Sequence, residues 1–254
     1  MPRVTLLTDF GTRDGYAAAL KGVIAQTCPG ALIDDATHDL AAGDVLGAAL
    51  TLERYWRRYP EGTVHMVVVD PGVGGDRRAL AVRADGRFLV GPDNGVFSRA
   101  LKGALDVEAR ELTQASSPDR EISATFHGRD IFAPAAALLA CGHALAELGP
   151  HAAHLVTLPE LDVVVAGDSL VGQVIHVDRF GNLITNIGIE ASGARQVRLA
   201  ALELGPVRRT YSDVASGAAL ALIGSGGLLE IAVRDGDAAQ TLQAALGDRV
   251  QVLR

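Results

Sequence analysis

The stretch VHMVVVDPGVGG, residues 64–75, decides the fold class of this 254-residue chain. Its opening run, residues 64–69, is almost entirely apolar, which is typical of a strand buried on both faces of a sheet. Asp70 and a series of glycines follow at once and mark a sharp turn at the end of that strand. Strands of this kind occur in sheets covered by helices, so the stretch predicts an α/β domain.

The residues before this strand alternate between strand-like and helix-like patterns. Residues 4–7 form another short apolar strand, and a helix is expected to follow it and to end before Pro29. The apolar face of that helix consists of Tyr16, Leu20, Val23 and Ile24. A second helix is expected to begin at Asp44 and to place Trp56 in the core. The alternation continues to about residue 155 and predicts an N-terminal α/β domain with a mainly parallel sheet over residues 1–158.

The pattern changes after about residue 160, where strand-like runs follow one another without helical periodicity. These runs cover residues 171–177, 196–202, 219–223, 229–233 and 249–253. Glycine, asparagine and aspartate separate them, as in antiparallel sheets joined by short turns. The pattern predicts a smaller C-terminal all-β domain, barrel-like, over residues 168–254.

Charge and hydropathy bound the classes of partner. The chain has 30 acidic and 23 basic side chains, a net charge of −7, and its arginines are mostly scattered, which disfavours nucleic acid as a partner. Its apolar runs fall well short of the roughly 18 residues that a membrane span needs. Met1-Pro2-Arg3 leads into the first strand without the pattern of a secretory leader. We therefore expect a cytoplasmic protein with no nucleic-acid or membrane partner.

The two cysteines, Cys28 and Cys141, are far apart in the sequence and have no spacing typical of zinc ligands. They are interpreted as ordinary buried thiols in a reducing compartment. No metal site is predicted.

Two carboxylates follow strand-like runs directly. Asp9 comes after the first strand and Asp70 after the strand that begins at Val64. Because ligands bind beyond the carboxyl ends of parallel strands, both side chains are expected at one rim of the sheet. Each could also be a simple turn or helix-capping aspartate. The glycine run after Asp70 lacks the Gly-Lys-Ser/Thr ending of a phosphate loop, which argues against a nucleoside triphosphate site.

Further candidates lie in other polar segments. His127 shares residues 125–130 with an arginine and an aspartate at the mouth of an expected helix, and Arg77 and Arg78 close the loop after Asp70. Residues 92–95 and 178–182 have the composition of turns and, taken alone, predict only turns.

Five segments together resemble one enzyme family. They are Thr8-Asp9-Phe10-Gly11, Val69-Asp70-Pro71-Gly72-Val73-Gly74, Gly91-Pro92-Asp93-Asn94-Gly95, Thr125-Phe126-His127-Gly128-Arg129-Asp130 and Asp178-Arg179-Phe180-Gly181-Asn182-Leu183-Ile184-Thr185-Asn186. In this order they resemble the S-adenosyl-L-methionine hydroxide adenosyltransferases, the adenosine-forming S-adenosylmethionine hydrolases. The resemblance extends from residue 8 to about residue 235.

The resemblance implies attack of a water-derived nucleophile at ribose C5′, which releases adenosine and L-methionine without a cofactor. Asp70, Arg77 and His127 match the family's Asp-Arg-His set. Asp70 and His127 would orient the water and take its proton, and either one could be the base. Arg77 would stabilise the hydroxide; its seven-residue distance from Asp70 favours it over Arg78.

The resemblance also implies the substrate contacts. Asp9 matches the carboxylate that binds the ribose diol, and Asn182, Phe180 and Tyr211 match positions around the adenine. Residues expected near the methionine group or as further contacts are Asp178, Ser225, Glu230 and Val233. In the family the pocket forms between the first domain of one subunit and the second domain of its neighbour, so a homotrimer is expected.

Three other functions stay open. A halogenase of the same fold is disfavoured, because the halogenating relatives carry tyrosines where this chain has Asp70 and His127, and Gly128 offers no hydroxyl. They also have an added loop, for which there is no room between Arg83 and Phe88. A calcium-dependent nucleoside hydrolase would need more oxygen ligands than the segment around Asp9 supplies. A non-catalytic adenosine- or S-adenosylmethionine-binding protein would not need the Asp-Arg-His set.

Overall fold

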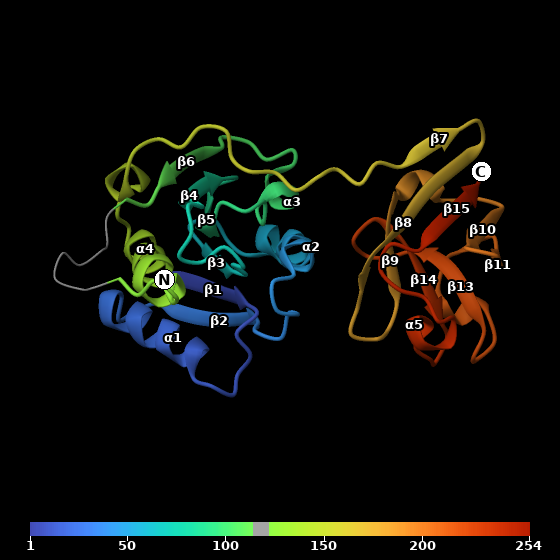
Figure 1. Ribbon diagram of the computed structural model, residues 1–254, viewed down its shortest axis with the longest axis horizontal. Coiled ribbons are helices and arrows are strands. Elements are labelled where there is room, and N and C mark those ends of the chain that lie inside the picture. The colour runs from blue at the N-terminus through green and yellow to red at the C-terminus, as the bar shows by residue number, and fades with distance from the viewer. Residues whose placement is uncertain (114–121) are drawn as a thin grey trace. The chain divides into compact units, whose positions relative to one another are not determined.

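The apolar run at residues 64–69 forms the centre of a sheet in the computed structural model, which describes residues 1–113 and 122–254 (Figure 1). Strand β3 (Val64–Val68) is buried at every position. The chain divides into two compact units, Met1–Leu158 and Pro159–Arg254.

The first unit contains a six-stranded sheet in the order β2-β1-β3-β5-β4-β6. Its strands are β1 (Arg3–Thr8), β2 (Leu32–Thr37), β3, β4 (Ala79–Ala84), β5 (Arg87–Pro92) and β6 (Glu108–Glu111). The first four in spatial order pair in parallel, while β4 pairs antiparallel with β5 and β6. The prediction of an α/β unit with a mainly parallel sheet is confirmed.

Helices pack on both faces of this sheet because successive residues of the central strands point to opposite sides. Val4 and Leu6 of β1 pack with α1 (Tyr16–Thr27) and α4 (Ala133–Ala140). Leu7 packs on the other face with α2 (Val45–Tyr55) and the fully buried Trp56. The Asp44 side chain caps α2 by accepting the backbone N–H of Gly47 at 2.8 Å. Short helical segments complete the unit: Trp56–Arg58, α3 (Ser98–Leu101), Gly128–Phe132 and Leu145–Leu148.

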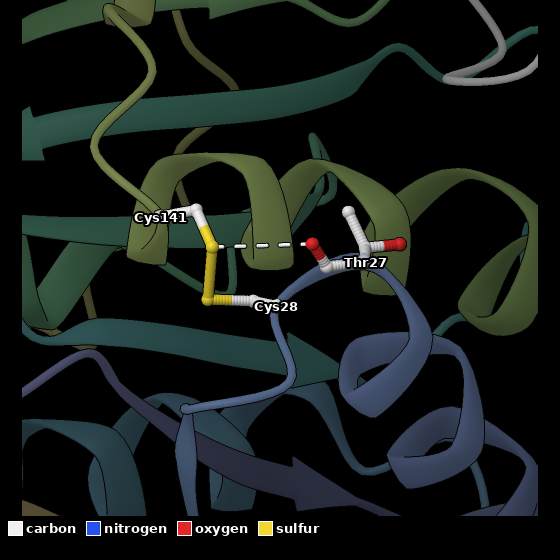
Figure 2. Close-up of a disulfide and its surroundings, with 3 residues drawn as sticks. All are labelled: Thr27, Cys28 and Cys141. Carbon is white, nitrogen blue, oxygen red and sulfur yellow. Dashed lines mark hydrogen bonds between the residues drawn. A yellow bond between two sulfur atoms is a disulfide. The ribbon is translucent and has the colours of Figure 1, made fainter.

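The interpretation of Cys28 and Cys141 as free buried thiols is wrong. Cys28 follows α1, Cys141 follows α4, and their sulfur atoms form a disulfide with the Cα atoms 5.8 Å apart (Figure 2). Cys28 is buried, whereas Cys141 is exposed. The two cysteines meet because α1 and α4 pack side by side on one face of the sheet, which their spacing in the sequence does not reveal. The argument from free thiols for a reducing compartment therefore fails.

The second unit is a nearly closed, barrel-like sheet of nine strands, as the sequence predicted. Eight of them follow the order β11-β10-β15-β8-β9-β14-β13-β12, and β7 pairs with β8. The strands are β7 (Val164–Ala166), β8 (Ser169–Val177), β9 (Leu183–Gly188), β10 (Gln196–Leu199), β11 (Leu202–Gly205), β12 (Val207–Arg208), β13 (Ala219–Ile223), β14 (Leu228–Val233) and β15 (Arg249–Leu253). The helical segments Ile189–Ala191, Tyr211–Asp213 and α5 (Ala238–Thr241) connect them.

One strand-like run of the sequence is divided in the structure. Residues 196–202 contribute to both β10 and β11, because Ala200 has a positive φ of 50° and turns the chain between them. Within the described ranges of both units, none of the helices has the length and apolar character that crossing a membrane requires.

Candidate functional site

A cavity of about 680 Å³ opens at the carboxyl ends of β1 and β3 in the first unit. Asp9, which follows β1, and Asp70, which follows β3, both line it. The other lining residues are Phe10, Tyr16, Ala42, Gly43, Val68, Pro71, Val73, Ser123, Thr125, Phe126, His127, Gly128 and Arg129. Parallel pairing of β1 with β3 explains why two carboxylates 61 positions apart reach the same rim.

Arg77 joins Asp70 and His127 into one hydrogen-bonded group at this cavity. Its Nε donates to both carboxylate oxygens of Asp70 at 3.0 Å, and its Nη2 donates to Oδ2 at 2.5 Å. The same Nη2 lies 2.8 Å from Nδ1 of His127. The side chains of Asp70 and Arg77 are only 5% and 11% exposed, so their charges interact with little screening by water. The ring of Phe132 lies 5.3 Å from the guanidinium carbon and packs beneath it.

The position of Arg77 defines the state of His127. An arginine can only donate hydrogen bonds, so Nδ1 of His127 accepts and the proton of the neutral ring is on Nε2. Burial lowers the pKa of His127 below its usual value, and the positive charge of Arg77 lowers it further. The histidine is therefore neutral near pH 7 and offers an N–H group from Nε2.

Gly74 brings together the two loops that carry this group. It has a φ of +78°, and a Cβ atom there would lie 2.4 Å from the carbonyl oxygen of Ala124. Only glycine allows that contact, which places the loop of Arg77 against the segment that leads to His127.

The neighbouring Arg78 has a different environment. It binds the buried carboxylate of Asp93 through Nε and Nη2, at 2.8 and 2.5 Å, and donates to the carbonyl oxygens of Ala153 and His154. Arg78 thus ties the turn at residues 92–95 to residues 153–154, whereas Arg77 bonds to Asp70 and His127, which line the cavity.

Several residues of the cavity wall were not found by sequence reasoning. The backbone N–H of Gly43 donates to Oδ2 of Asp9 at 2.8 Å. The rings of Phe10, Tyr16 and Phe126 contact one another edge to face, with centroids 5.3 to 6.2 Å apart. Phe10 and Phe126 belong to two of the five segments that resemble the family, but no role was predicted for either ring.

The second unit has a cavity of about 620 Å³ that contains four of the predicted substrate contacts. Phe180, Asn182, Tyr211 and Val233 line it, together with Thr210, Ser212, Arg234, Asp235 and Gly236. Phe180 is 75% exposed and Tyr211 43% exposed, so two flat aromatic side chains are open to a ligand beside the amide of Asn182.

Two further predicted residues support this cavity from behind. Asp178 accepts the backbone N–H groups of Phe180 and Asn182 at 2.8 and 2.9 Å, and the amide of Asn182 at 3.0 Å. The hydroxyl of Tyr211 donates to Glu230. Burial raises the pKa of Tyr211, and this hydrogen bond raises it further, so the hydroxyl keeps its proton. Ser225 is exposed in the turn between β13 and β14, outside the residues that line the cavity.

Within residues 1–113 and 122–254, no group of three or more His, Cys, Asp or Glu side chains is placed to hold a metal ion.

Comparison with known proteins identifies the family. Residues 4–149 match the model of the SAM hydroxide adenosyltransferase N-terminal domain, and residues 172–251 match that of the C-terminal domain. The chain belongs to the SAM hydroxide adenosyltransferase family. Together the two matched ranges contain Asp9 and the Asp70–Arg77–His127 group as well as the cavity around Asn182.

Two relatives cover all or nearly all of this chain. It is 41% identical to the (R)-S-adenosyl-L-methionine hydrolase of Salinispora tropica over 99% of this chain and 97% of that protein. It is also 41% identical to the enzyme of the same name from Thermus thermophilus, over the full length of both. Proteins named fluorinase are more distant, for example 28% identical in Nocardia brasiliensis. An uncharacterized conserved protein from Thermotoga maritima has a similar structure, with a TM-score of 0.91 and 35% identity over 99% of this chain and 100% of that one.

Proposed function

We propose that the protein hydrolyses S-adenosyl-L-methionine to adenosine and L-methionine by displacement at ribose C5′. The observation that carries the proposal is the joining of Asp70, Arg77 and His127 at the cavity that Asp9 also lines. The full-length identity to proteins named as hydrolases of the (R) epimer supports this substrate.

The reaction places its chemical demand on the water. As the water oxygen bonds to C5′, the C5′–S bond breaks and its electron pair stays on sulfur, so methionine leaves as a neutral thioether. A neutral leaving group needs no general acid and no metal, and we propose that no cofactor takes part. The site must instead hold the water in line with the C–S bond and remove one of its protons.

The hydrogen bonds of the Asp-Arg-His group divide these tasks. Nδ1 of His127 accepts a hydrogen bond from Arg77, so the ring proton is on Nε2. Nε2 can therefore donate to the water oxygen but cannot take a proton from it. We therefore assign the proton acceptor to Asp70, with Arg77 stabilising the developing hydroxide. The D70N variant should lose about 10²- to 10⁴-fold in kcat. The H127Q variant, whose amide can replace the Nε2–H donor, should keep more activity than H127A. Loss in H127Q as large as in D70N would assign the base to His127.

The remaining predicted residues would bind the rest of the substrate. Asp9 would hold the ribose diol, Asn182 with Phe180 and Tyr211 the adenine, and Asp178 with Ser225 the methionine group. Glu230 and Val233 would add contacts in the same segment, Glu230 through its bond to Tyr211. The two sets of residues belong to different compact units, which is compatible with a site shared by two subunits of a homotrimer.

Subunit mixing tests the shared site. D70N and N182A should each be inactive, and co-expression of the two should restore activity if each site takes one half from each of two subunits. Failure of the mixed assembly to regain any activity would refute the shared site without affecting the reaction.

The reaction is tested by incubating the protein with each sulfonium epimer in H₂¹⁸O, with and without fluoride or chloride. Label in the 5′-hydroxyl of adenosine supports hydrolysis. A 5′-halide would support the halogenase alternative, free adenine lost on chelation would support a calcium-dependent nucleoside hydrolase, and bound adenosine without turnover would support a binding protein.

A cytoplasmic location stays part of the proposal, because a charged sulfonium nucleoside does not cross membranes unaided.

A further inference from the structure

Two buried polar residues support the loop of Asp9 without lining the cavity. Thr8, the last residue of β1, is fully buried, and His38, which follows β2, is 4% exposed. The Thr8 hydroxyl lies 2.8 Å from Nδ1 of His38. Burying a hydroxyl and an imidazole costs free energy unless their hydrogen bonds are made, so this pair needs fixed partners.

Those partners form a chain with one direction. Nε2 of His38 lies 3.0 Å from Asp35, whose carboxylate also accepts from Lys21 at 2.6 Å. The nitrogen beside the carboxylate, Nε2, is assigned the ring proton, which leaves Nδ1 to accept the proton of the Thr8 hydroxyl. Although partial burial acts to raise it, the hydrogen bonds from Lys21 and His38 hold the pKa of Asp35 below its usual value. The carboxylate therefore stays charged and orients His38.

The series of contacts from Lys21 through Asp35 and His38 to Thr8 fixes both ends of the segment 8–11. The Thr8 hydroxyl accepts the backbone N–H of Phe10 at 3.2 Å, and the carbonyl oxygen of His38 accepts the N–H of Gly11 at 2.8 Å. Gly11 has a φ of +64°, which turns the loop back toward His38. Asp9 lies between these two fixed points, and its carboxylate has its own bond to Gly43. The direction in which Asp9 points is thus set by contacts outside the cavity.

We propose that Thr8 and His38 are positioning residues for Asp9 that hold its carboxylate in the geometry needed for the ribose diol. This inference rests on the proposed function, since it takes the ribose as the ligand of Asp9. Two hydroxyls bound by one carboxylate require its plane to be fixed, and a small rotation would break one of the two bonds.

The same strand provides a matched control. Thr5 is also fully buried in β1, and its hydroxyl lies 2.9 Å from Nδ1 of His65 and 3.2 Å from the hydroxyl of Tyr55. This second Thr–His pair has the same chemistry, but it adjoins no residue of the cavity wall. The T5V variant therefore reports the cost of losing a buried Thr–His bond away from Asp9.

The kinetic test compares T8V, T8S and T5V. T8V should raise the KM for S-adenosylmethionine about tenfold with a smaller effect on kcat, because it loses the hydroxyl that bonds both His38 and the backbone N–H of Phe10. T8S keeps the hydroxyl and should restore KM, and T5V should leave KM unchanged. In a D9N background T8V should add nothing further to KM. Equal effects of T8V and T5V on KM, or additive effects of T8V and D9N, would refute the positioning role.

A second measurement separates this inference from the proposed function. Amide hydrogen exchange at Phe10 and Gly11, measured without substrate, should be faster in T8V than in the wild type and unchanged in T5V. If the wild type neither binds nor cleaves S-adenosylmethionine, the proposed function fails, while exchange still decides whether Thr8 and His38 hold the loop. Unchanged exchange in T8V would overturn the inference whatever the activity.

Discussion

The disulfide between Cys28 and Cys141 should provide a large part of the stability of the first unit. It closes a loop with a sequence separation of 113 residues, and the chain-entropy relation for a loop of that length gives about 4.8 kcal/mol at 25 °C. For a unit of this size, that free energy corresponds to a melting temperature higher by about 10 to 20 °C. The C28S/C141S variant and the reduced wild type should both lose it.

The assay is scanning calorimetry of the full chain in three forms: oxidised wild type, reduced wild type and C28S/C141S. The last two should both melt well below the oxidised wild type, with C28S/C141S the lower of the two, because its serine adds a hydroxyl at the buried position 28. Thiol titration of the denatured, oxidised protein should find no free thiol. Two free thiols, or a melting temperature of C28S/C141S within about 2 °C of the oxidised wild type, would refute the reasoning.

Three further predictions concern the first unit. Burial lowers the pKa of His65 to about 3, and the nearby charge of Arg87 contributes. Because the unfolded chain protonates this histidine near pH 6.5 and the folded protein only near pH 3, the free energy of unfolding is unaffected above about pH 6.5 and decreases as the pH falls from there toward 3. Denaturant unfolding at pH 7 and pH 3 should show the wild type losing about 5 kcal/mol more than H65Q, and equal losses would argue against this environment. The pKa of His127 is also lowered, first by burial and then by Arg77, so activity should fall only below about pH 6.5, and R77Q should move this acid limb to higher pH in a kcat/KM profile. The G74A variant should lose about 10²-fold in kcat/KM, because its Cβ would separate the loops of Arg77 and His127. G62A, with a similar φ of +79° and open space around the added atom, should keep its activity.

Regular hydrophobic patterns carried most of the fold prediction. The strands that begin near Val4 and Val64 and the helices after Gly15 and Asp44 lie where periodicity places them, because each buries a continuous apolar face. Strand β2 was not found from the pattern, since LIDDAT is an edge strand and only partly buried. Its sheet position follows from pairing with β1, which no local signal encodes.

The motif residues of the candidate site could be predicted from the sequence, but the residues that hold them in place could not. Asp9, Asp70 and His127 belong to short glycine-rich segments, and such segments are visible in a sequence. Gly43 and His38 act through hydrogen bonds to residues 30 or more positions away in the sequence. Tyr16 acts through the packing of its ring against Phe126. The disulfide is a similar case, because two distant cysteines pair only when their helices meet.

The disulfide also gives the polypeptide a covalent ring from Cys28 to Cys141, with Asp70, Arg77 and His127 inside it and Asp9 outside. A single backbone cut within the ring, for example at the exposed turn of Gly103, would leave one molecule under oxidising conditions and two fragments after reduction. The chain should therefore tolerate a cut at this turn without separation of the first unit, because the sulfur bridge keeps its two parts tethered.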